Sequence, residues 1–455
     1  MSTELKPYDK YKRTPYDWLD VVPTHWKQLS VRSITELSSE RNGERNDLEL
    51  LSVYREYGVI RKASRNDNHN VESVDLCNYK FVDKGYLVLN KMKMWQGSLG
   101  VSKNRGIVSP AYIVCKLIGE FNFLYIHYLL RSPMFKTIYN RISYGVRIGQ
   151  WDMRYDDFKN IKLFIPPKDE QDKIVCYLDS SLSKINTFIK TKKRLIEVLK
   201  EQRQAITNEA VSRGIDPNAK MKPSGIDWLG DIPDGWDTVR CKYLFREIDT
   251  RSTTGLETHL SMSQKLGLVP DEQLTERRLL SENYIGGKVC SKDDLVLNRL
   301  KAHLGVFALA SQTGVISPDY TVLRPNEKIY PIFAETILKS QKCRRELRTR
   351  VRGIVEGFWR LYTDDFNNIV LPLPKYEEQV LIMEHLNQKS FSIDVTILRI
   401  EKEIELITEY RTRLISDVVT GKLDVRGITI DDVSEDSEEL DDESLSDEDG
   451  DENVN

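Results

Sequence analysis

The chain has 455 residues, of which 30% are charged, and a formal net charge of −3. This length allows two or three domains with cores of their own. No run of 18 apolar residues and no apolar leader occurs, so we expect neither a membrane span nor a signal peptide. Six scattered cysteines without a C-x-x-C pair predict reduced thiols in a cytoplasmic protein rather than a zinc site or a disulfide framework.

The net charge hides an uneven distribution. Residues 431–455 hold 14 acidic residues and no Lys or Arg, so the rest of the chain has 67 basic against 56 acidic residues, or +11. A basic body is typical of a protein with a polyanionic partner such as nucleic acid, although a solvated surface with a small excess of lysine gives the same count. We expect residues 425–455 to form an acidic disordered tail.

The first half of the chain predicts a mixed domain followed by one long helix. After an N-terminal arm, residues 1–15, short apolar runs such as Tyr86–Leu89 and Tyr112–Cys115 are bounded by Gly, Asn and Pro, as strands usually are. Helical spacing predicts a helix from Phe123 to about Tyr139. We therefore expect a globular domain over residues 16–168.

A long helix is predicted next, over residues 169–212. Pro167 precedes Asp169 and Glu170, and proline ahead of an acidic first turn is typical of a helix start, because the carboxylates meet unpaired N–H groups there. Apolar residues then follow steps of three and four, which is the coiled-coil period. This first seam consists of Leu178, Leu182, Ile185, Ile189, Ile196, Leu199 and Ile206.

The second half repeats the first about 208 residues later. The segment Gly106–Tyr112 (GIVSPAY) returns as Gly314–Tyr320 (GVISPDY). The repeat predicts a linker over residues 213–224, a second globular domain over residues 225–376, and a second long helix with its end over residues 377–424. The second seam consists of Ile393, Ile397, Ile400, Ile404, Ile407, Leu414 and Val418.

We expect the two helices to pair with each other, because each lone apolar stripe would face water. A pseudo-two-fold axis across the pair makes them antiparallel and puts the domains at opposite ends. The predicted fold class is α+β, with two tandem-repeated domains separated by two long antiparallel coiled-coil helices. Arg203 and Arg411 interrupt the two seams at one shared position, where we expect them to pair with carboxylates such as Glu401 or Glu197, or to face a partner protein.

These motifs resemble the specificity subunit of type I restriction-modification systems, over about residues 12–424. Each target-recognition domain of that family opens with a segment like Ser224–Trp236 (SGIDWLGDIPDGW). The first copy, Thr14–Trp26 (TPYDWLDVVPTHW), lacks the glycines but keeps both tryptophans and the proline. Other family-like motifs are Ser109-Pro110 and Ser317-Pro318, the helix openings Glu170-Gln171 and Glu378-Gln379, and the endings Val211–Gly214 and Val419–Asp424.

The resemblance implies a reader and a scaffold. Each target-recognition domain would read one half of a split sequence in double-stranded DNA, and the helix pair would fix the gap between the halves. Two methylation subunits would dock on the helices and methylate one adenine in each half-site, and motor-nuclease subunits would add cleavage. S-adenosylmethionine, ATP and Mg²⁺ would belong to those partners, so we expect no cofactor and no small-molecule substrate in this chain.

The residues of the chain agree with a non-catalytic role. The sequence has no G-x-x-x-x-G-K-[ST] phosphate loop, no Asn-Pro-Pro-Tyr-like methylation motif and no H-x-x-x-H spacing for a metal. Asp156-Asp157 and Asp364-Asp365 match across the repeat, and we interpret them as a turn or cap rather than a metal-binding pair.

Two pairs of loops are the first candidates for DNA contact. Lys91–Ser98 and Arg299–Gly305 interleave basic, aromatic and polar groups after a predicted strand, although a solvated hairpin would look the same. Tyr144–Trp151 and Arg352–Arg360 each carry two glycines that allow close approach to phosphate, and we interpret Trp151 and Trp359 as core residues. The candidate side chains are Lys91, Lys93, Trp95, Gln96, Arg147, Gln150, Arg299, Lys301, His303, Arg352 and Arg360.

Segments that differ between the halves are candidates for reading different half-sites, although loop drift would also make them differ. The segments are Arg41–Asn70 and Arg251–Arg278, with the candidates Arg61, Lys62, Arg65, Gln264, Lys265 and Arg277. The densest basic run contains Arg345, Arg348 and Arg352, which would lie along phosphates or on a solvated helix face. Two other readings stay open: a coiled-coil protein–protein adaptor, and a specificity subunit of a methylation-only defence system.

Overall fold

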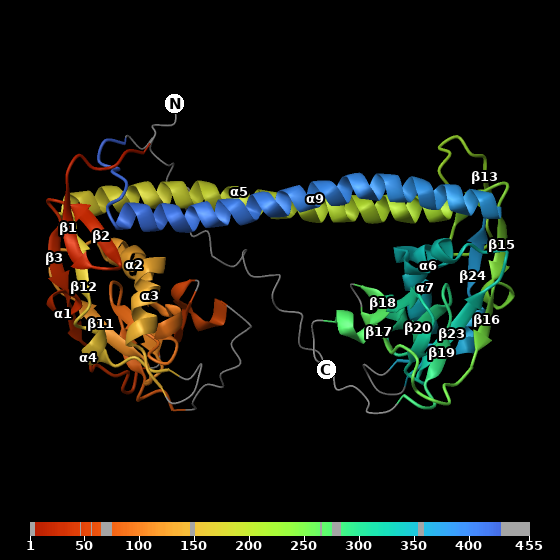
Figure 1. Ribbon diagram of the computed structural model, residues 1–455, viewed down its shortest axis with the longest axis horizontal. Helices are drawn as coiled ribbons and strands as arrows, with labels where there is room; N and C mark the ends of the chain where they lie inside the picture. The colour runs from red at the N-terminus through yellow and green to blue at the C-terminus, as the bar shows by residue number, and fades with distance from the viewer. Residues whose placement is uncertain are drawn as a thin grey trace. The chain divides into compact units, whose positions relative to one another are not determined.

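A computed structural model of the chain describes residues 5–45, 47–55, 57–64, 75–145, 151–263, 266–274, 284–353 and 359–428. The chain divides into two compact units, residues 1–193 with 401–455 and residues 194–400. Each unit holds one β-rich domain, here domain 1 and domain 2, and parts of two long helices, α5 (Lys168–Arg213) and α9 (Tyr376–Val419) (Figure 1).

Domain 1 is built on a four-stranded antiparallel sheet with the order β4-β11-β8-β9. Two-stranded pairs β1-β2, β3-β12, β5-β6 and β7-β10 surround it. Its strands are β1 (Tyr11–Tyr16), β2 (Leu19–Pro23), β3 (Lys27–Ser30), β4 (Thr35–Leu37), β5 (Leu51–Tyr54), β6 (Gly58–Arg61), β7 (Lys80–Val82), β8 (Leu87–Leu89), β9 (Leu99–Val101), β10 (Gly106–Val108), β11 (Ile113–Leu117) and β12 (Lys162–Ile165). Its helices and 3₁₀ turns are α1 (Val31–Ile34), η1 (Lys62–Ser64), η2 (Met94–Gln96), α2 (Phe123–Arg131), α3 (Pro133–Ile142) and α4 (Tyr155–Phe158).

Domain 2 repeats this architecture element by element. Its four-stranded sheet has the order β16-β23-β20-β21, with the pairs β13-β14, β15-β24, β17-β18 and β19-β22. Its strands are β13 (Met221–Pro223), β14 (Asp231–Pro233), β15 (Asp237–Arg240), β16 (Phe245–Ile248), β17 (Leu260–Ser263), β18 (Gly267–Pro270), β19 (Lys288–Cys290), β20 (Leu295–Asn298), β21 (Phe307–Leu309), β22 (Gly314–Ile316), β23 (Tyr320–Pro325) and β24 (Val370–Leu373). Its helices and turns are η3 (Cys241–Tyr243), η4 (Asp271–Gln273), η5 (Ala302–Leu304), α6 (Pro331–Lys339), α7 (Gln341–Arg350) and α8 (Thr363–Asn367).

The predicted strands at Tyr86–Leu89 and Tyr112–Cys115 are confirmed as β8 and β11, but the single helix predicted over residues 123–139 is wrong. The chain forms two helices, α2 and α3, separated at Ser132. Ser132 has an extended backbone with φ −62° and ψ 149°, because the residue before Pro133 is disfavoured in helical conformation. Pro133 then begins α3, where a missing N–H costs nothing.

The Glu-Gln motif at the start of each long helix ties that helix to its domain. Glu170 accepts hydrogen bonds from Trp26 Nε1 at 2.9 Å and from the Tyr8 hydroxyl at 2.7 Å, and it lies 2.7 Å from His25 Nε2. In domain 2, Trp236 Nε1 donates to Glu378 at 2.8 Å. The repeated tryptophans are therefore buried anchors of the long helices.

The glutamine of the same motif makes the second tie. The side chain of Gln171 donates to the carbonyl of Pro166 and accepts from the backbone N–H of Asn122, both at 2.9 Å. Gln379 does the same with Pro374, at 2.9 Å, and Tyr330, at 2.7 Å. Each glutamine thus joins the start of the long helix to the start of the first domain helix, α2 or α6.

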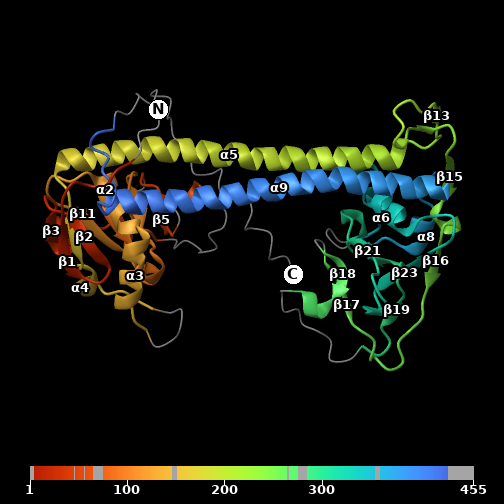
Figure 2. The same cartoon turned by 45° about the horizontal axis from the view of Figure 1, so that its top comes forward.

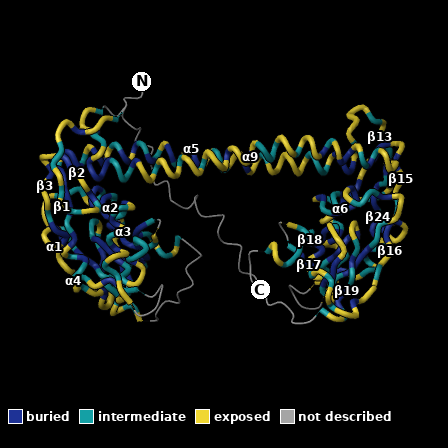
Figure 3. Tube along the Cα trace, in the orientation of Figure 1, coloured by how far each residue is buried: buried dark blue, intermediate teal, exposed yellow. Residues whose placement is uncertain are grey.

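Helices α5 and α9 run side by side and antiparallel in each unit, as predicted (Figures 1 and 2). The mutual face carries the predicted seam (Figure 3). Its buried members are Leu178, Leu182, Ile185, Ile189, Ile196, Ile397, Ile400, Leu414 and Val418, and its half-buried members are Leu199, Ile206, Ile393, Ile404 and Ile407.

Polar residues interrupt the seam differently in the two units. Arg203 pairs with Asp394 at 2.6 Å, so the predicted partners Glu401 and Glu197 are wrong. Glu197 instead pairs with Arg194, one turn away on the same helix. Arg411 stands at the position equivalent to Arg203, but its Nε is buried without a hydrogen-bond partner among the described residues.

The first and last described segments of the chain meet in the first unit. The backbone N–H of Asp424 donates to the carbonyl of Lys6 at 2.8 Å. Val425, at the start of the predicted tail, is buried against domain 1, and residues 429–455 lie outside the described residues. The last residues of the predicted linker form strand β13, which pairs with β14.

Candidate nucleic-acid interface

The first candidate loop has the same backbone in both domains. The chain leaves β8 or β20, makes one 3₁₀ turn, η2 or η5, and ends it at Gly97 or Gly305 in left-handed conformation, with φ of 88° and 82°. Glycine is required there because side chains rarely adopt such φ values. The loop is therefore the turn of a β-hairpin, β8-β9 or β20-β21, and the alternative of a solvated hairpin stays open.

The side chains of these loops differ in exposure. Lys93 and Lys301 are exposed, whereas Lys91 is half-buried with its Nζ 3.6 Å from Asp152, and Trp95 and Gln96 are also half-buried. Arg299 donates to the Thr321 hydroxyl at 2.6 Å and lies 3.7 Å from Glu247. His303 is buried. Only part of the predicted set therefore faces solvent.

The structure brings the first candidate loop of each domain together with the second. The backbone N–H of Met153 donates to the carbonyl of Lys91 at 3.1 Å, and the N–H of Leu361 donates to that of Arg299 at 3.0 Å. Ring pairs reinforce both junctions. Their centroid distances are 5.2 Å for Trp95–Trp151 and 5.5 Å for His303–Trp359.

The prediction that both tryptophans are core residues is wrong for Trp359, whose exposed fraction is 40%, and Trp151 is only half-buried. Each ring packs edge-on against the aromatic residue of the first loop rather than into the domain core. The sequence did not reveal this exposure, because a tryptophan is equally hydrophobic whether it supports a loop or fills a core.

The basic run of domain 2 lies mostly on α7. This helix buries Cys343 and Leu347, which leaves Arg345 and Arg348 exposed to solvent. Three further arginines of the region have partners within the domain. Arg350 pairs with Glu346, and Arg352 pairs with Asp365. Arg360 forms a backbone bridge with Arg352.

In domain 1 the hairpin β5-β6 carries Arg61 and leads into the turn that begins with Lys62. Arg61 is exposed and lies 2.9 Å from Glu49, and Lys62 is half-buried. The remaining candidates, Arg65, Arg147, Gln150, Gln264, Lys265 and Arg277, lie outside the described residues.

Two residues that sequence reasoning missed hold this hairpin in place. Arg131 on α2 donates to the carbonyls of Leu99 at 2.7 Å and Arg55 at 3.0 Å. His127, one turn earlier, accepts from the N–H of Val101 at 3.2 Å. Burial, and then the charge of Arg131, hold the pKa of His127 well below its usual value, so the ring stays neutral as an acceptor. Their i, i+4 spacing within the predicted helix was the available signal.

The paired aspartates are structural, as interpreted. Asp156 and Asp157 lie in the first turn of α4, and Asp364 and Asp365 in that of α8. Asp156 pairs with Lys159, and Asp157 accepts from the Tyr144 hydroxyl. Among the described residues, no three His, Cys, Asp or Glu side chains gather into a metal-binding group. None of the described helices is long and apolar enough to cross a membrane.

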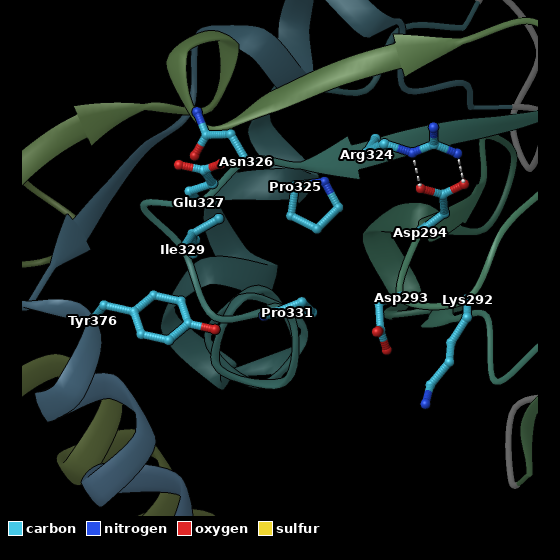
Figure 4. A pocket seen from close by; sticks show the side chains of 10 residues that line it. All are labelled: Lys292, Asp293, Asp294, Arg324, Pro325, Asn326, Glu327, Ile329, Pro331 and Tyr376. Carbon is cyan, nitrogen blue, oxygen red and sulfur yellow. Dashed lines mark hydrogen bonds and ion pairs between the residues drawn. The ribbon is translucent and has the colours of Figure 1, made fainter.

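A hollow of about 430 Å³ lies on domain 2 (Figure 4). Arg324 on its wall is held by the carboxylate of Asp294, with two contacts at 2.7 and 2.8 Å. Lys292 and Asp293 lie next to each other on one side of the same hollow, and Glu327 lies on the other side. Three carboxylates outnumber the two cations, so the hollow does not favour a polyanion, and the interface candidates lie elsewhere.

Comparisons with known proteins agree with this architecture. Residues 23–198 match the family model described as the type I restriction modification DNA specificity domain. The type I restriction enzyme MjaVIII specificity subunit of Methanocaldococcus jannaschii is 26% identical over 362 residues, which cover 74% of this chain and 79% of that protein.

One solved structure shares the fold at low identity. A chain from a study of complex assembly and conformational transition of the type I R-M system aligns with a TM-score of 0.63 at 15% identity, over 90% of this chain and 100% of that one. The specificity subunit from Thermoanaerobacter tengcongensis aligns over the same shares at 15% identity, with a TM-score of 0.49. The matched family model and the relative therefore make this chain similar to the specificity subunits of type I restriction-modification systems, the non-catalytic subunits that set target recognition within the complex, and the catalytic cofactors of that family belong to the modification and restriction subunits.

Proposed function

We propose that each domain of this chain reads one half of a split target in double-stranded DNA. The helix pair α5 and α9 sets the unspecified gap and docks two methylation subunits, which methylate an adenine in each half-site. Motor-nuclease subunits complete the restriction complex. The observation that carries the proposal is the duplication of one loop junction, Lys91 with Met153 and Arg299 with Leu361, in two domains whose side chains differ.

Charge and position support contact with DNA at these junctions. The chain without its acidic tail carries +11, and a protein that neutralises phosphates needs such an excess. Lys93 and Lys301 are exposed at equivalent places of the two junctions, which suits contacts with the backbone of each half-site.

Exposed apolar residues on the long helices support docking of partner subunits. They are Phe188, Leu195 and Val198 on α5, and Leu381, Phe391, Leu398, Leu406 and Tyr410 on α9. A helix pair that has already buried one seam gains further stability when a partner removes such side chains from water. A docking surface of this kind also explains why the sequence pattern is compatible with a coiled-coil protein–protein adaptor.

Domain exchange tests the reader role. Residues 16–167 are replaced by the target-recognition domain of another specificity subunit, and the methylated sequences are mapped in a methylation-free host that also expresses the methylation subunit. The proposal predicts that one half-site changes and the other is kept. Replacement of residues 225–376 is the matched control and changes the other half-site. Loss of both half-sites in each exchange, with the complex intact, contradicts the proposal.

A charge placed on the exposed helix face tests docking. The double variant Phe391→Glu and Leu398→Glu would bury two unpaired carboxylates under a partner, so we expect at least tenfold weaker binding of the methylation subunit. Thr396→Glu, also exposed on α9, is the control. If the native chain, the double variant and Thr396→Glu bind equally in a pull-down titration, the methylation subunit does not dock on this face.

Helix length tests the spacing role. Insertion of two heptads into both helices keeps the seam in phase and adds about 21 Å, which corresponds to roughly six base pairs. We expect the unspecified gap of the methylated sequence to lengthen accordingly. An unchanged gap with intact methylation excludes the helix pair as the spacer.

A further inference from the structure

An exposed indole lies at the junction of the two candidate loops in domain 2. The ring of Trp359 meets that of His303 at 69°. His303 is only 7% exposed, and its Nδ1 has no hydrogen-bond partner among the residues that the structure describes. Burial, and then the charge of Arg348, lower the pKa of His303, so its ring is neutral at physiological pH. The buried ring supports the indole edge-on, and 40% of Trp359 remains exposed to solvent.

Two arginines of α7 lie near the turn and the histidine that support this indole. The guanidinium of Arg344 lies against Gly305, where a Cβ would come within 3.3 Å of Nε, so a larger residue at that turn would displace it. Arg348 is close enough to His303 to shift its pKa. Both arginines are exposed, since α7 turns Cys343 and Leu347 into the core.

We propose that Trp359, His303, Arg344 and Arg348 form a nucleotide-contacting site in domain 2. The exposed indole packs against a base or deoxyribose at one position of the half-site, and the two arginines hold the flanking phosphates. Aromatic rings bordered by cations are the means by which proteins bind nucleotides through the flat face of the base and the charge of the backbone. This site rests on the proposed function, since it assumes that domain 2 reads DNA.

Domain 1 lacks the same combination at the equivalent positions. Its ring pair is Trp95 with Trp151, both half-buried. On α3, Lys136 takes the place of Arg344, with its side chain against Gly97, and Asn140 takes the place of Arg348. The site therefore belongs to one half of the target, and its loss leaves the other half-site unaffected.

The test uses the full chain with its methylation subunit and a duplex that carries the methylated sequence. Each nucleotide of the second half-site is replaced in turn by an abasic site, and dissociation constants are measured for the native chain, Trp359→Ala and Trp359→Phe. Tyr362→Ala is the matched control, because Tyr362 is a nearby aromatic that is also exposed. We expect Trp359→Ala to weaken binding about 10- to 100-fold and Trp359→Phe to restore most of it.

The abasic series identifies the contact. At one position, removal of the base weakens binding by the native chain but not by Trp359→Ala, since the partner of the missing indole is already gone. If removal of the base at every position weakens binding by Trp359→Ala as much as binding by the native chain, the stacking contact is overturned.

A second arm removes the phosphate contacts. Arg344→Gln with Arg348→Gln lowers the slope of log affinity against log salt by about 1.8, at roughly 0.9 per contact, and an unchanged slope would overturn that part.

Failure of this inference is distinguishable from failure of the proposed function. If the native complex neither methylates nor binds a split sequence, domain 2 is not a reader and the proposed function fails. If the native complex does both and Trp359→Ala behaves as Tyr362→Ala does, only the nucleotide site fails. Hydrogen exchange over α7 and α8 identifies a variant that has unfolded, in which case Trp359→Phe and the arginine variants decide.

Discussion

Domains 1 and 2 share one frame but differ in the basic residues that two equivalent pairs of elements carry. In domain 1 the hairpin β5-β6 ends in Arg61 and Lys62, and the equivalent residues of domain 2 are Pro270 and Asp271. In domain 2 the exposed arginines lie on α7, whose counterpart α3 has the sequence PMFKTIYNRI. Buried positions are fixed by packing, so divergence is concentrated on the outward faces, and under the proposed function these elements would meet the two half-sites with different side chains.

The two hairpins are also held by different contacts. In domain 1, Arg131 and His127 on α2 hold β5-β6 and its neighbour β9, whereas the equivalent residues of α6, Lys339 and Glu335, pair with each other at 2.7 Å. In domain 2, His259 is bonded to Asp271 and stacks on Tyr284, with ring centroids 3.9 Å apart. Lys62 of one hairpin and the half-buried His259–Asp271 contact of the other therefore occupy the same place in the fold.

The largest expected difference between the domains lies at the helix anchors. Glu170→Ala removes the acceptor of Trp26, Tyr8 and His25, and we expect local stability to fall by about 3 kcal/mol or more, because buried donors lose their partner. Glu378→Ala removes one bond, and we expect about 1 kcal/mol. Hydrogen exchange at the starts of α5 and α9 measures both, and equal losses would contradict this account of the anchors.

Removal of the hairpin cations should affect DNA binding through domain 1. Arg61→Gln with Lys62→Gln would weaken binding roughly tenfold at moderate salt and lower the salt slope by up to about 1.8. Asp271→Asn at the position equivalent to Lys62 is the comparison, for which we expect no loss of slope. Titrations at several salt concentrations give both quantities. If the double variant leaves the slope of log affinity against log salt unchanged, the hairpin does not contact DNA phosphates.

The acceptor role of His127 predicts a pH dependence confined to domain 1. Its pKa is lowered in the folded state, so the unfolded chain binds the extra proton, and stability falls as the pH drops below the unfolded value near 6.5. The fall is at most about 1.4 kcal/mol per pH unit. His127→Asn keeps an acceptor for Val101 without titrating, so hydrogen exchange in domain 1 should depend less on pH from 7.5 to 5.5. An unchanged dependence refutes this role.

The smallest effect concerns the polar layer of the seam. Arg203 pairs with Asp394, but the positions equivalent to these are Arg411 and Asn186, and Asn186 Oδ1 is buried with no partner in the described part of the chain. Asn186→Asp should supply a carboxylate for Arg411 and stabilise the first unit by about 0.5–1 kcal/mol. Asp394→Asn should destabilise the second unit similarly. Thermal unfolding of the two variants compares them, and destabilisation by Asn186→Asp would show that the layers are not equivalent.

The sequence predicted the repeat, the fold class and the helix seam, because periodic burial and duplicated motifs leave a local record. It did not predict the partner of Arg203, since that depends on which turn of α9 lies opposite it. It also did not predict the exposure of Trp359, which depends on how two loops meet. Of the candidate site, the junction residues were visible as motifs, while the supports supplied by Arg131 and Lys136 became apparent only once α2 and α3 were placed against the loops.

The most direct measurement of the central claim is the methylome of a methylation-free host that expresses this chain with its methylation subunit. The account predicts one split sequence with methyladenine in both halves and a fixed gap between them. Unmodified DNA from cells in which the two proteins form a stable complex, or methylation of a single uninterrupted sequence, would contradict it.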